Sequence, residues 1–167
     1  MKHILVIGTG RSSSVLIEYL LNYSLSNDVC ITVLDQFKNE FLNQFSNFQN
    51  FKSLVFDIHD DKLRHVEIKK SDLIISMLPA RFHTLIAQDC LNFRKNLITA
   101  SYVSEEMKSF HKKALEADIL MLNEIGLDPG IDHVSAMSII DTLKSQNFKI
   151  TSFKSFCGGL IAPDSCN

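Results

Sequence analysis

The stretch that decides the fold is Ile4-Leu5-Val6-Ile7-Gly8-Thr9-Gly10-Arg11-Ser12-Ser13. Its first four residues are apolar, as in a parallel strand buried on both faces. The pattern GxGxxG follows, with serine in place of the third glycine. In dinucleotide-binding folds these positions allow a tight turn, a close approach to pyrophosphate and helix–strand packing, and the helix N-terminus attracts phosphate. We therefore predict dinucleotide contacts at Gly8, Gly10, Arg11, Ser12 and Ser13. A plain tight turn is the alternative that this motif alone leaves open.

Outward from this stretch, short apolar runs alternate with segments of helical periodicity, a pattern typical of a parallel sheet covered by helices. We predict an α/β fold, a Rossmann-type doubly wound parallel sheet, over residues 1–148. Residues 149–167 are expected to begin an incomplete α+β domain for substrate binding and dimerisation, with its first strand at 150–157. The predicted strands are 2–7, 29–34, 52–56, 73–77, 96–99 and 119–122. The predicted helices are 13–23, 38–45, 60–70, 81–92, 105–116 and 132–145.

Asp35 ends the second predicted strand, 25 residues after Gly10. A carboxylate there accepts hydrogen bonds from adenosine ribose hydroxyls and repels the 2′-phosphate of NADP. Because no arginine directly follows Asp35, we expect NAD as the cofactor, with NADP the less favoured. A solvated carboxylate at the start of a loop is the alternative interpretation.

Further cofactor contacts are expected where the next strands end, because loops at the carboxyl ends of parallel strands line the cofactor crevice. Asp57 and Ile58 follow the third strand, although an ordinary turn also explains them. Ser76, Leu78 and Pro79 close the fourth strand, where the chain is expected to pass the pyrophosphate and the nicotinamide ribose.

The bulk properties exclude several classes of function. The 17 basic and 19 acidic side chains give a net charge of -2 and are interleaved, so neither nucleic acid nor a membrane is an expected partner. The first strand begins almost at Met1, which predicts a cytoplasmic protein. The four cysteines form no CxxC pair and are expected to be reduced. No spacing of metal ligands appears, so no metal is expected.

Three later segments are hard to explain as generic Rossmann sequence: residues 76–79 with His83 following, residues 99–103 (TASYV) and residues 123–133 (NEIGLDPGIDH). Together they resemble saccharopine dehydrogenases of the glutamate-forming type, and residues 155–160 (SFCGGL) with Ala162-Pro163 resemble that family's continuation. The resemblance implies that saccharopine, NAD and water give glutamate and 2-aminoadipate 6-semialdehyde, as in lysine degradation. It also implies a homodimer at full length. Family members are more than twice as long, which implies a truncated, inactive chain.

The resemblance further implies roles for single residues. Ser101 and Tyr102 are candidates for binding the substrate, and Cys157 and Gly158 for lining its pocket. Leu127, Asp128 and Gly130 are expected to pass beside the nicotinamide. Hydride transfer at a C–N bond changes the charge on nitrogen, so a carboxylate can stabilise the iminium, and Glu124 and Asp128 are the candidate catalytic residues. His83 and His133 are candidate bases that the sequence does not decide between.

Other functions remain open at this stage. An imine reductase of the carboxynorspermidine dehydrogenase type would share the fold and the cofactor. A non-catalytic NAD-sensing module would need the glycine loop and Asp35 alone. A methyltransferase could share the glycines and the acid at the strand end. The 99–103 and 123–133 segments argue against the last two.

Overall fold

The computed structural model describes residues 1–156 and 158. Its centre is a six-stranded sheet in the order β3-β2-β1-β4-β5-β6, and every pairing is parallel. This order is that of a Rossmann fold, with β1 in the middle and the strand sequence reversing beside it. The predicted fold class is therefore confirmed. The strands are β1 (Lys2–Ile7), β2 (Val29–Asp35), β3 (Phe51–Val55), β4 (Leu73–Ser76), β5 (Asn96–Thr99) and β6 (Met121–Leu122).

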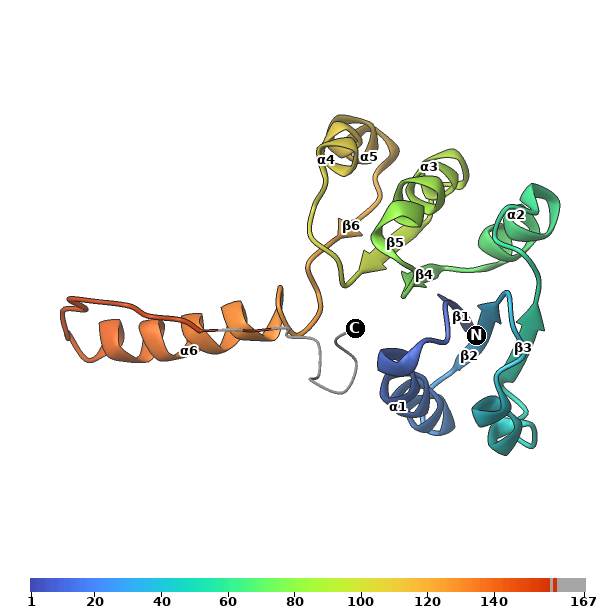
Figure 1. The fold of residues 1–167 in the computed structure, drawn as a ribbon, viewed down its shortest axis with the longest axis horizontal. Coiled ribbons are helices and arrows are strands. Elements are labelled where there is room, and N and C mark those ends of the chain that lie inside the picture. The colour runs from blue at the N-terminus through green and yellow to red at the C-terminus, as the bar shows by residue number, and fades with distance from the viewer. Residues whose placement is uncertain (157, 159–167) are drawn as a thin grey trace, which may run out of the picture.

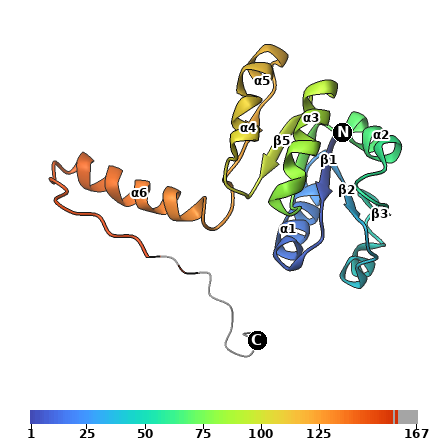
Figure 2. The same ribbon diagram turned by 45° about the horizontal axis from the view of Figure 1, so that its top comes forward.

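Helices cover both faces of the sheet. Helix α1 lies on one face, and α2 and α3 lie on the other (Figures 1 and 2). The α-helices are α1 (Ser14–Leu25), α2 (Asp61–Lys70), α3 (His83–Phe93), α4 (Glu105–Ser109), α5 (His111–Ala117) and α6 (Ile131–Ser145). Three short 3-10 helices complete the described elements: η1 (Arg11–Ser13), η2 (Glu40–Phe45) and η3 (Ala80–Phe82).

The core forms two layers because successive strand residues point to opposite faces. Leu5 and Ile7 of β1 pack into the cluster beneath α2 and α3, whereas Val6 packs into the cluster beneath α1. Apolar residues buried on both faces are what the run Ile4–Ile7 predicts. The edge strand β3 is half-exposed.

Several predicted elements need correction. The helix predicted at 38–45 is the 3-10 helix η2, in which Leu42 N–H bonds back three residues to Asn39. The helix predicted at 105–116 is divided at Phe110, whose N–H bonds to Met107 and so tightens the last turn of α4. The strand predicted at 119–122 shortens to β6. No strand is assigned to residues 150–156, where no neighbouring strand pairs with the described backbone.

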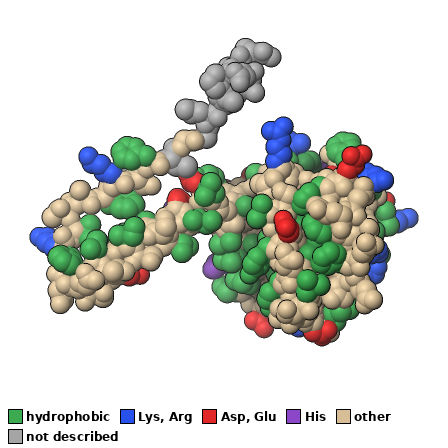
Figure 3. Space-filling view, turned by 90° about the horizontal axis from the view of Figure 1, so that it is seen from below, with side chains coloured by type: hydrophobic (Ala, Val, Ile, Leu, Met, Phe, Trp, Pro, Cys, Tyr) green, Lys and Arg blue, Asp and Glu red, His purple; other side chains and the backbone are tan. Residues whose placement is uncertain are grey.

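The C-terminal arm, residues 131–156, stands away from the sheet (Figures 1 and 2). Helix α6 buries none of its residues, and the chain then turns back, with Phe148 N–H bonding to Leu143. Its large apolar side chains face solvent (Figure 3), among them Ile131, Val134, Ile139 and Phe148. Within the part of the chain that the structure describes, no helix is both long enough and apolar enough to cross a membrane.

Candidate functional site

The glycine loop between β1 and α1 has the features that phosphate binding needs. Gly8 has a φ of +103°, and a Cβ there would lie 2.9 Å from the Met77 carbonyl oxygen, so this position requires glycine. Around Gly10 the space is open: no atom lies within 4 Å of the position that a Cβ would take. Ser13 is buried, and its Oγ donates to the Gly10 carbonyl at 2.6 Å. The serine therefore braces the loop from within, and the backbone outside Gly10 stays accessible.

Asp35 reaches back from the end of β2 to this loop. Its Oδ2 accepts hydrogen bonds from Thr9 N at 2.6 Å and Thr9 Oγ1 at 2.8 Å, and its Oδ1 accepts one from Phe37 N at 3.1 Å. Asn39 Nδ2 donates to the Thr9 carbonyl at 3.0 Å. Thr9 and Asn39 were not singled out by the sequence. For Thr9 the signal is its position between the two glycines of the GxG motif, which places its side chain beside the acid that ends the second strand.

A cavity of about 320 Å³ opens at the carboxyl ends of these strands. It brings together seven predicted cofactor residues from four loops, namely Gly8, Gly10, Asp35, Asp57, Ile58, Leu78 and Pro79, and adds Thr9, Gln36, Phe56, His59, Met77, Arg81 and Phe82. Convergence of these loops is what the strand order of a Rossmann fold produces. Arg11, Ser12 and Ser13 form η1 beside the cavity, outside its lining.

Ser76 departs from its predicted place. Its side chain is fully buried and bonds to His83 Nδ1 at 2.9 Å, so it points into the protein and not into the cavity. The ring's other nitrogen, Nε2, lies 2.8 Å from Ser101 Oγ. Burial lowers the pKa of the His83 imidazole, which keeps the ring neutral at pH 7.

The cavity wall at Ile58 is held by a buried ion pair that sequence reasoning missed. Arg64 of α2 is 2% exposed and donates from Nη1 to the Ile58 carbonyl. Its Nε donates to Asp89 of α3 at 2.6 Å, and His65 Nε2 lies 2.9 Å from the same carboxylate. Because each buried charge has a partner, the pair fixes the loop after β3. Nothing in the spacing of these residues along the chain signals that contact.

The predicted substrate residues lie together at the end of β5. Tyr102 Oη donates to Asp128 Oδ1 at 2.8 Å, and Glu124 Oε1 accepts the Val103 N–H at 3.0 Å. Glu124 also donates its own N–H to the Ser101 carbonyl at 3.1 Å. Four of the predicted residues, Ser101, Tyr102, Glu124 and Asp128, are thus neighbours, although 27 positions separate the first from the last.

The loop after β6 is shaped by contacts between its own backbone groups. Gly130 has a φ of +147°, and a Cβ there would collide with the Gly126 carbonyl oxygen. The glycine is therefore required by the loop's own folding, and neither Leu127, Asp128 nor Gly130 lines the cavity at the glycine loop. Leu127 is 74% exposed.

Of the remaining candidates, His133 lines a hollow together with Glu124 and Gly130. Cys157 lies outside the described residues. Gly158 is exposed, and no atom lies within 4 Å of the position that a Cβ would take there. His133 Nδ1 lies 2.8 Å from Asp132, a hydrogen bond that raises the pKa of the imidazole. Cys30 and Cys90 are free thiols, and burial raises the pKa of the Cys90 thiol to about 12.

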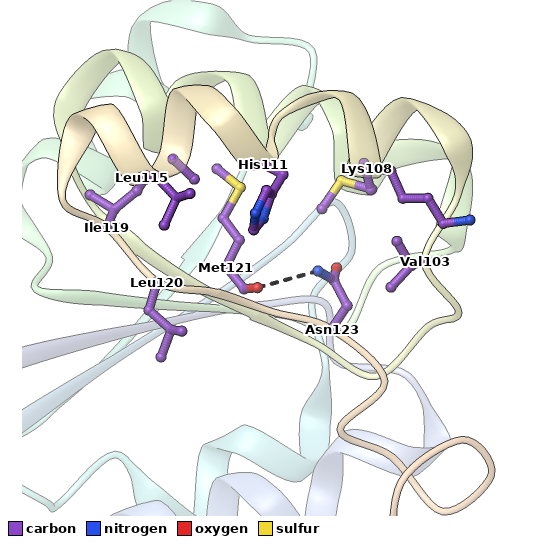
Figure 4. Close-up of a pocket in the computed structure, with 10 residues that line it drawn as sticks. Val103, Lys108, His111, Leu115, Ile119, Leu120, Met121 and Asn123 are labelled. Carbon is purple, nitrogen blue, oxygen red and sulfur yellow. Dashed lines mark hydrogen bonds between the residues drawn. The ribbon is translucent and has the colours of Figure 1, made fainter.

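A second, larger cavity of about 550 Å³ lies between β6 and the helices α4 and α5 (Figure 4). Its walls are mostly apolar, including Val103, Met107, Leu115 and Met121, and Asn123 Nδ2 donates to the Met121 carbonyl. It includes neither the glycine loop nor Asp35, so it is not the candidate dinucleotide site.

Comparison with known families decides the relationship. Residues 4–122 match the model described as the saccharopine dehydrogenase NADP binding domain, and residues 126–167 match the saccharopine dehydrogenase C-terminal domain. The chain belongs to the saccharopine dehydrogenase family. Within this oxidoreductase family, residues 4–122 are the pyridine-nucleotide-binding domain. The two matches meet between residues 122 and 126, ahead of α6.

Individual relatives agree with this assignment. The chain is 38% identical over 165 residues to the mitochondrial alpha-aminoadipic semialdehyde synthase of Mus musculus, covering 98% of this chain and 17% of the relative. It is 34% identical to the NADP(+), L-glutamate-forming saccharopine dehydrogenase of Pyricularia oryzae, covering 98% of this chain and 36% of the relative. The apo saccharopine dehydrogenase (L-Glu forming) of Saccharomyces cerevisiae superposes with a TM-score of 0.76 and 26% identity, covering 88% of this chain and 32% of that one. The chain thus spans about a third or less of the length of each of these relatives.

Proposed function

We propose that this chain is the dinucleotide-binding part of an NAD-dependent saccharopine dehydrogenase. The observation that carries the proposal is the cavity at the strand ends, where Gly8, Gly10, Asp35 and Leu78 meet. In the family's reaction, saccharopine, NAD⁺ and water give glutamate, 2-aminoadipate 6-semialdehyde, NADH and a proton. The carbon of a C–N bond loses a hydride, and water then cleaves the resulting imine.

The residues present fit a dinucleotide. The open space at Gly10 lets a pyrophosphate approach the backbone, and the N-terminus of η1 and α1 presents free N–H groups and a partial positive charge. Asp35 would accept the adenosine ribose hydroxyls, and Asp57 and Ile58 line the same cavity. When bound, the nicotinamide supplies the hydride acceptor. The protein's part is to hold and orient it.

NAD is proposed over NADP on the charge at Asp35. A 2′-phosphate placed against this carboxylate would meet a negative charge that the loop donors Thr9 and Phe37 hold in place. The family model and the fungal relatives carry NADP in their names, so the preference proposed here sets this chain apart from them. A small hollow beside Asp35 is lined by Lys38 and Asn39, whose side chains could donate to a 2′-phosphate.

Glu124 and Asp128 are proposed to stabilise the iminium that hydride transfer creates. Both carboxylates lie next to residues 101–103, and Tyr102 holds Asp128 through its hydroxyl. The substrate is proposed to lie over Ser101 and Tyr102. Cys157 and Gly158 are proposed to line the same pocket.

The chain as given is proposed to bind NAD without turning over saccharopine. The exposed apolar side chains of α6 support a larger active enzyme, in which a substrate-binding domain beginning near residue 149 covers them and a homodimer forms. Positioning of a substrate accounts for roughly 7 to 11 kcal/mol of a barrier, so loss of the covering domain is expected to abolish detectable turnover.

Two measurements test the proposal. Titration calorimetry with NAD and with NADP gives the two affinities of the 167-residue chain, and tighter binding of NAD is expected. Absorbance of NADH at saturating saccharopine is then compared between this chain and one extended to the length of its relatives. Failure of both dinucleotides to bind would refute the proposal, and equal turnover by both chains would show that the site is complete within these residues.

A further inference from the structure

His83 joins the two halves of the candidate site. It begins α3 and is 3% exposed, between the end of β4, whose loop lines the dinucleotide cavity, and the end of β5. Its Nδ1 lies 2.9 Å from Ser76 Oγ, and its Nε2 lies 2.8 Å from Ser101 Oγ. The ring is therefore bonded by a serine hydroxyl at each nitrogen.

The two hydrogen bonds of the ring must have opposite directions, one donated by a ring nitrogen and one accepted by the other. In a neutral imidazole one nitrogen donates and the other accepts, and the depressed pKa of His83 makes the neutral ring the form present at pH 7. Two arrangements remain. Either Nδ1–H donates to Ser76 and Ser101 donates to Nε2, or Ser76 donates to Nδ1 and Nε2–H donates to Ser101.

The buried hydroxyl of Ser76 decides between them. Ser76 has no exposed surface, and among the described residues His83 Nδ1 is the partner that the structure gives its Oγ. If Nδ1 carried the proton, the Ser76 hydroxyl hydrogen would be buried without an acceptor, which costs roughly 1 to 3 kcal/mol. If Ser76 donates to Nδ1, its hydrogen is satisfied and only a spare lone pair is left.

We propose that His83 is a positioning residue in its Nε2-protonated form, which donates to Ser101 and turns the Ser101 hydroxyl hydrogen outward toward the substrate. Ser101 is half-buried at the strand end, so this hydrogen can reach a ligand. Resting on the proposed function, the assignment specifies that the Ser101 hydroxyl hydrogen bonds to a hydrogen-bond acceptor of the ligand.

The surroundings narrow the acceptor further. The carboxylates of Glu124 and Asp128 bond to Val103 and Tyr102, directly after Ser101. Glu124 also acts on Lys108, and both carboxylates act on His133, so charges of both signs share this region. An uncharged carbonyl oxygen, the group carried by an aldehyde substrate or product at the reacting carbon, is the acceptor whose binding depends least on these charges.

The tautomer is measured by NMR on the 167-residue chain with ¹⁵N-labelled histidine at pH 7.5, and the His83 signals are assigned by their loss in His83→Gln. We expect the proton on Nε2 and a bare Nδ1. Ser76→Ala removes the donor to Nδ1 and should shift the Nδ1 signal toward that of an unbonded nitrogen, whereas Ser101→Ala should leave Nδ1 bare. A protonated Nδ1 in the unmodified chain overturns the proposal, even where Ser76→Ala does not fold. So does an Nδ1 signal that does not change in Ser76→Ala, because Ser76 would then not be its donor.

The ligand class is tested with three five-carbon probes: pentan-2-one, pentanoate and pentylammonium. The ketone is expected to shift the His83 Nε2–H signal at the lowest concentration, and Ser101→Ala should weaken its binding roughly two- to tenfold. Preference for pentylammonium, preference for pentanoate, or no shift with any probe overturns the carbonyl assignment. Because neither measurement uses a dinucleotide, failure of NAD to bind would refute the proposed function and leave the tautomer result standing.

Discussion

Replacing Asp35 by alanine is expected to weaken NAD binding by roughly one to two orders of magnitude. The carboxylate lies at the cavity with Oδ2 held by Thr9 and Oδ1 bonded to Phe37 N–H at 3.1 Å. A hydrogen bond from a ribose hydroxyl to this charged group is worth roughly 1.5 to 3 kcal/mol, and each 1.4 kcal/mol is a factor of ten in affinity. The same substitution removes the repulsion of a 2′-phosphate, so NADP binding should hold or improve.

Calorimetric titration of both dinucleotides against Asp35→Ala measures this directly. Asp141→Ala removes an exposed carboxylate on α6 and serves as the matched control, with no expected effect. Thr9→Val separates the two parts of the contact, because it removes the Oγ1 bond and leaves the charge; a loss of roughly two- to tenfold is expected. Equal affinity of the unmodified chain for NAD and NADP, or an unchanged NAD affinity in Asp35→Ala, would refute the reasoning.

The contacts of the site and of its walls give three more testable expectations. Gly10→Val should abolish dinucleotide binding and leave circular dichroism unchanged, because the added atoms enter open space; retained binding would make the loop an ordinary turn. Arg64→Met should lower the free energy of unfolding by about 3 to 5 kcal/mol, because the buried Asp89 loses its arginine partner and keeps only His65; urea titration measures it, and a loss below about 1 kcal/mol contradicts it. The unfolded state binds a proton at His83 near pH 6.5, whereas burial lowers the folded pKa, so stability should fall as the pH drops below about 6.5 and fall less in His83→Gln. Parallel pH slopes for the two chains would contradict this.

The sheet was predictable because its signals are local. Buried parallel strands must be apolar on both faces, and Ile4–Ile7 and Leu73–Ile75 are so in the sequence itself. The type of helix was not predictable. A 3-10 helix and an α-helix share the apolar spacing of residues 38–45 and differ only in which carbonyl each N–H reaches. In the described part of the strand predicted at 150–157, residues 150–156, no neighbouring strand pairs with the backbone, and pairing is what a strand needs most. The boundary at residue 148 stays a prediction.

The site was predictable where one residue type has one physical reason to be present. Gly8 is of this kind, since a backbone with positive φ demands glycine. Asp35 is another, since a dinucleotide-binding fold places an acceptor for the ribose hydroxyls at the end of its second strand. The direction of the Ser76 side chain was not predictable, because sequence gives the end of a strand without telling which way the last side chain points. Arg64 and Asp89, 25 positions apart on different helices, meet only through packing. For Gly130 the structure adds a reason that the sequence did not supply: its own loop occupies the space beside it. Its contact with the nicotinamide stays a prediction.

The order of the strands also brings two groups of residues, distant in the sequence, to neighbouring strand ends. From β2 through β1 and β4 to β5, the strand ends carry in turn Asp35, the glycine loop, Leu78 and Ser101. Ser76 and Thr99 are paired in register, so the loops after them leave the sheet side by side, about 4.8 Å apart. A dinucleotide bound as proposed, from Asp35 across the glycine loop, would have its other end one strand away from Ser101. His83 spans that single step, which is why one buried ring can bond to both strand ends.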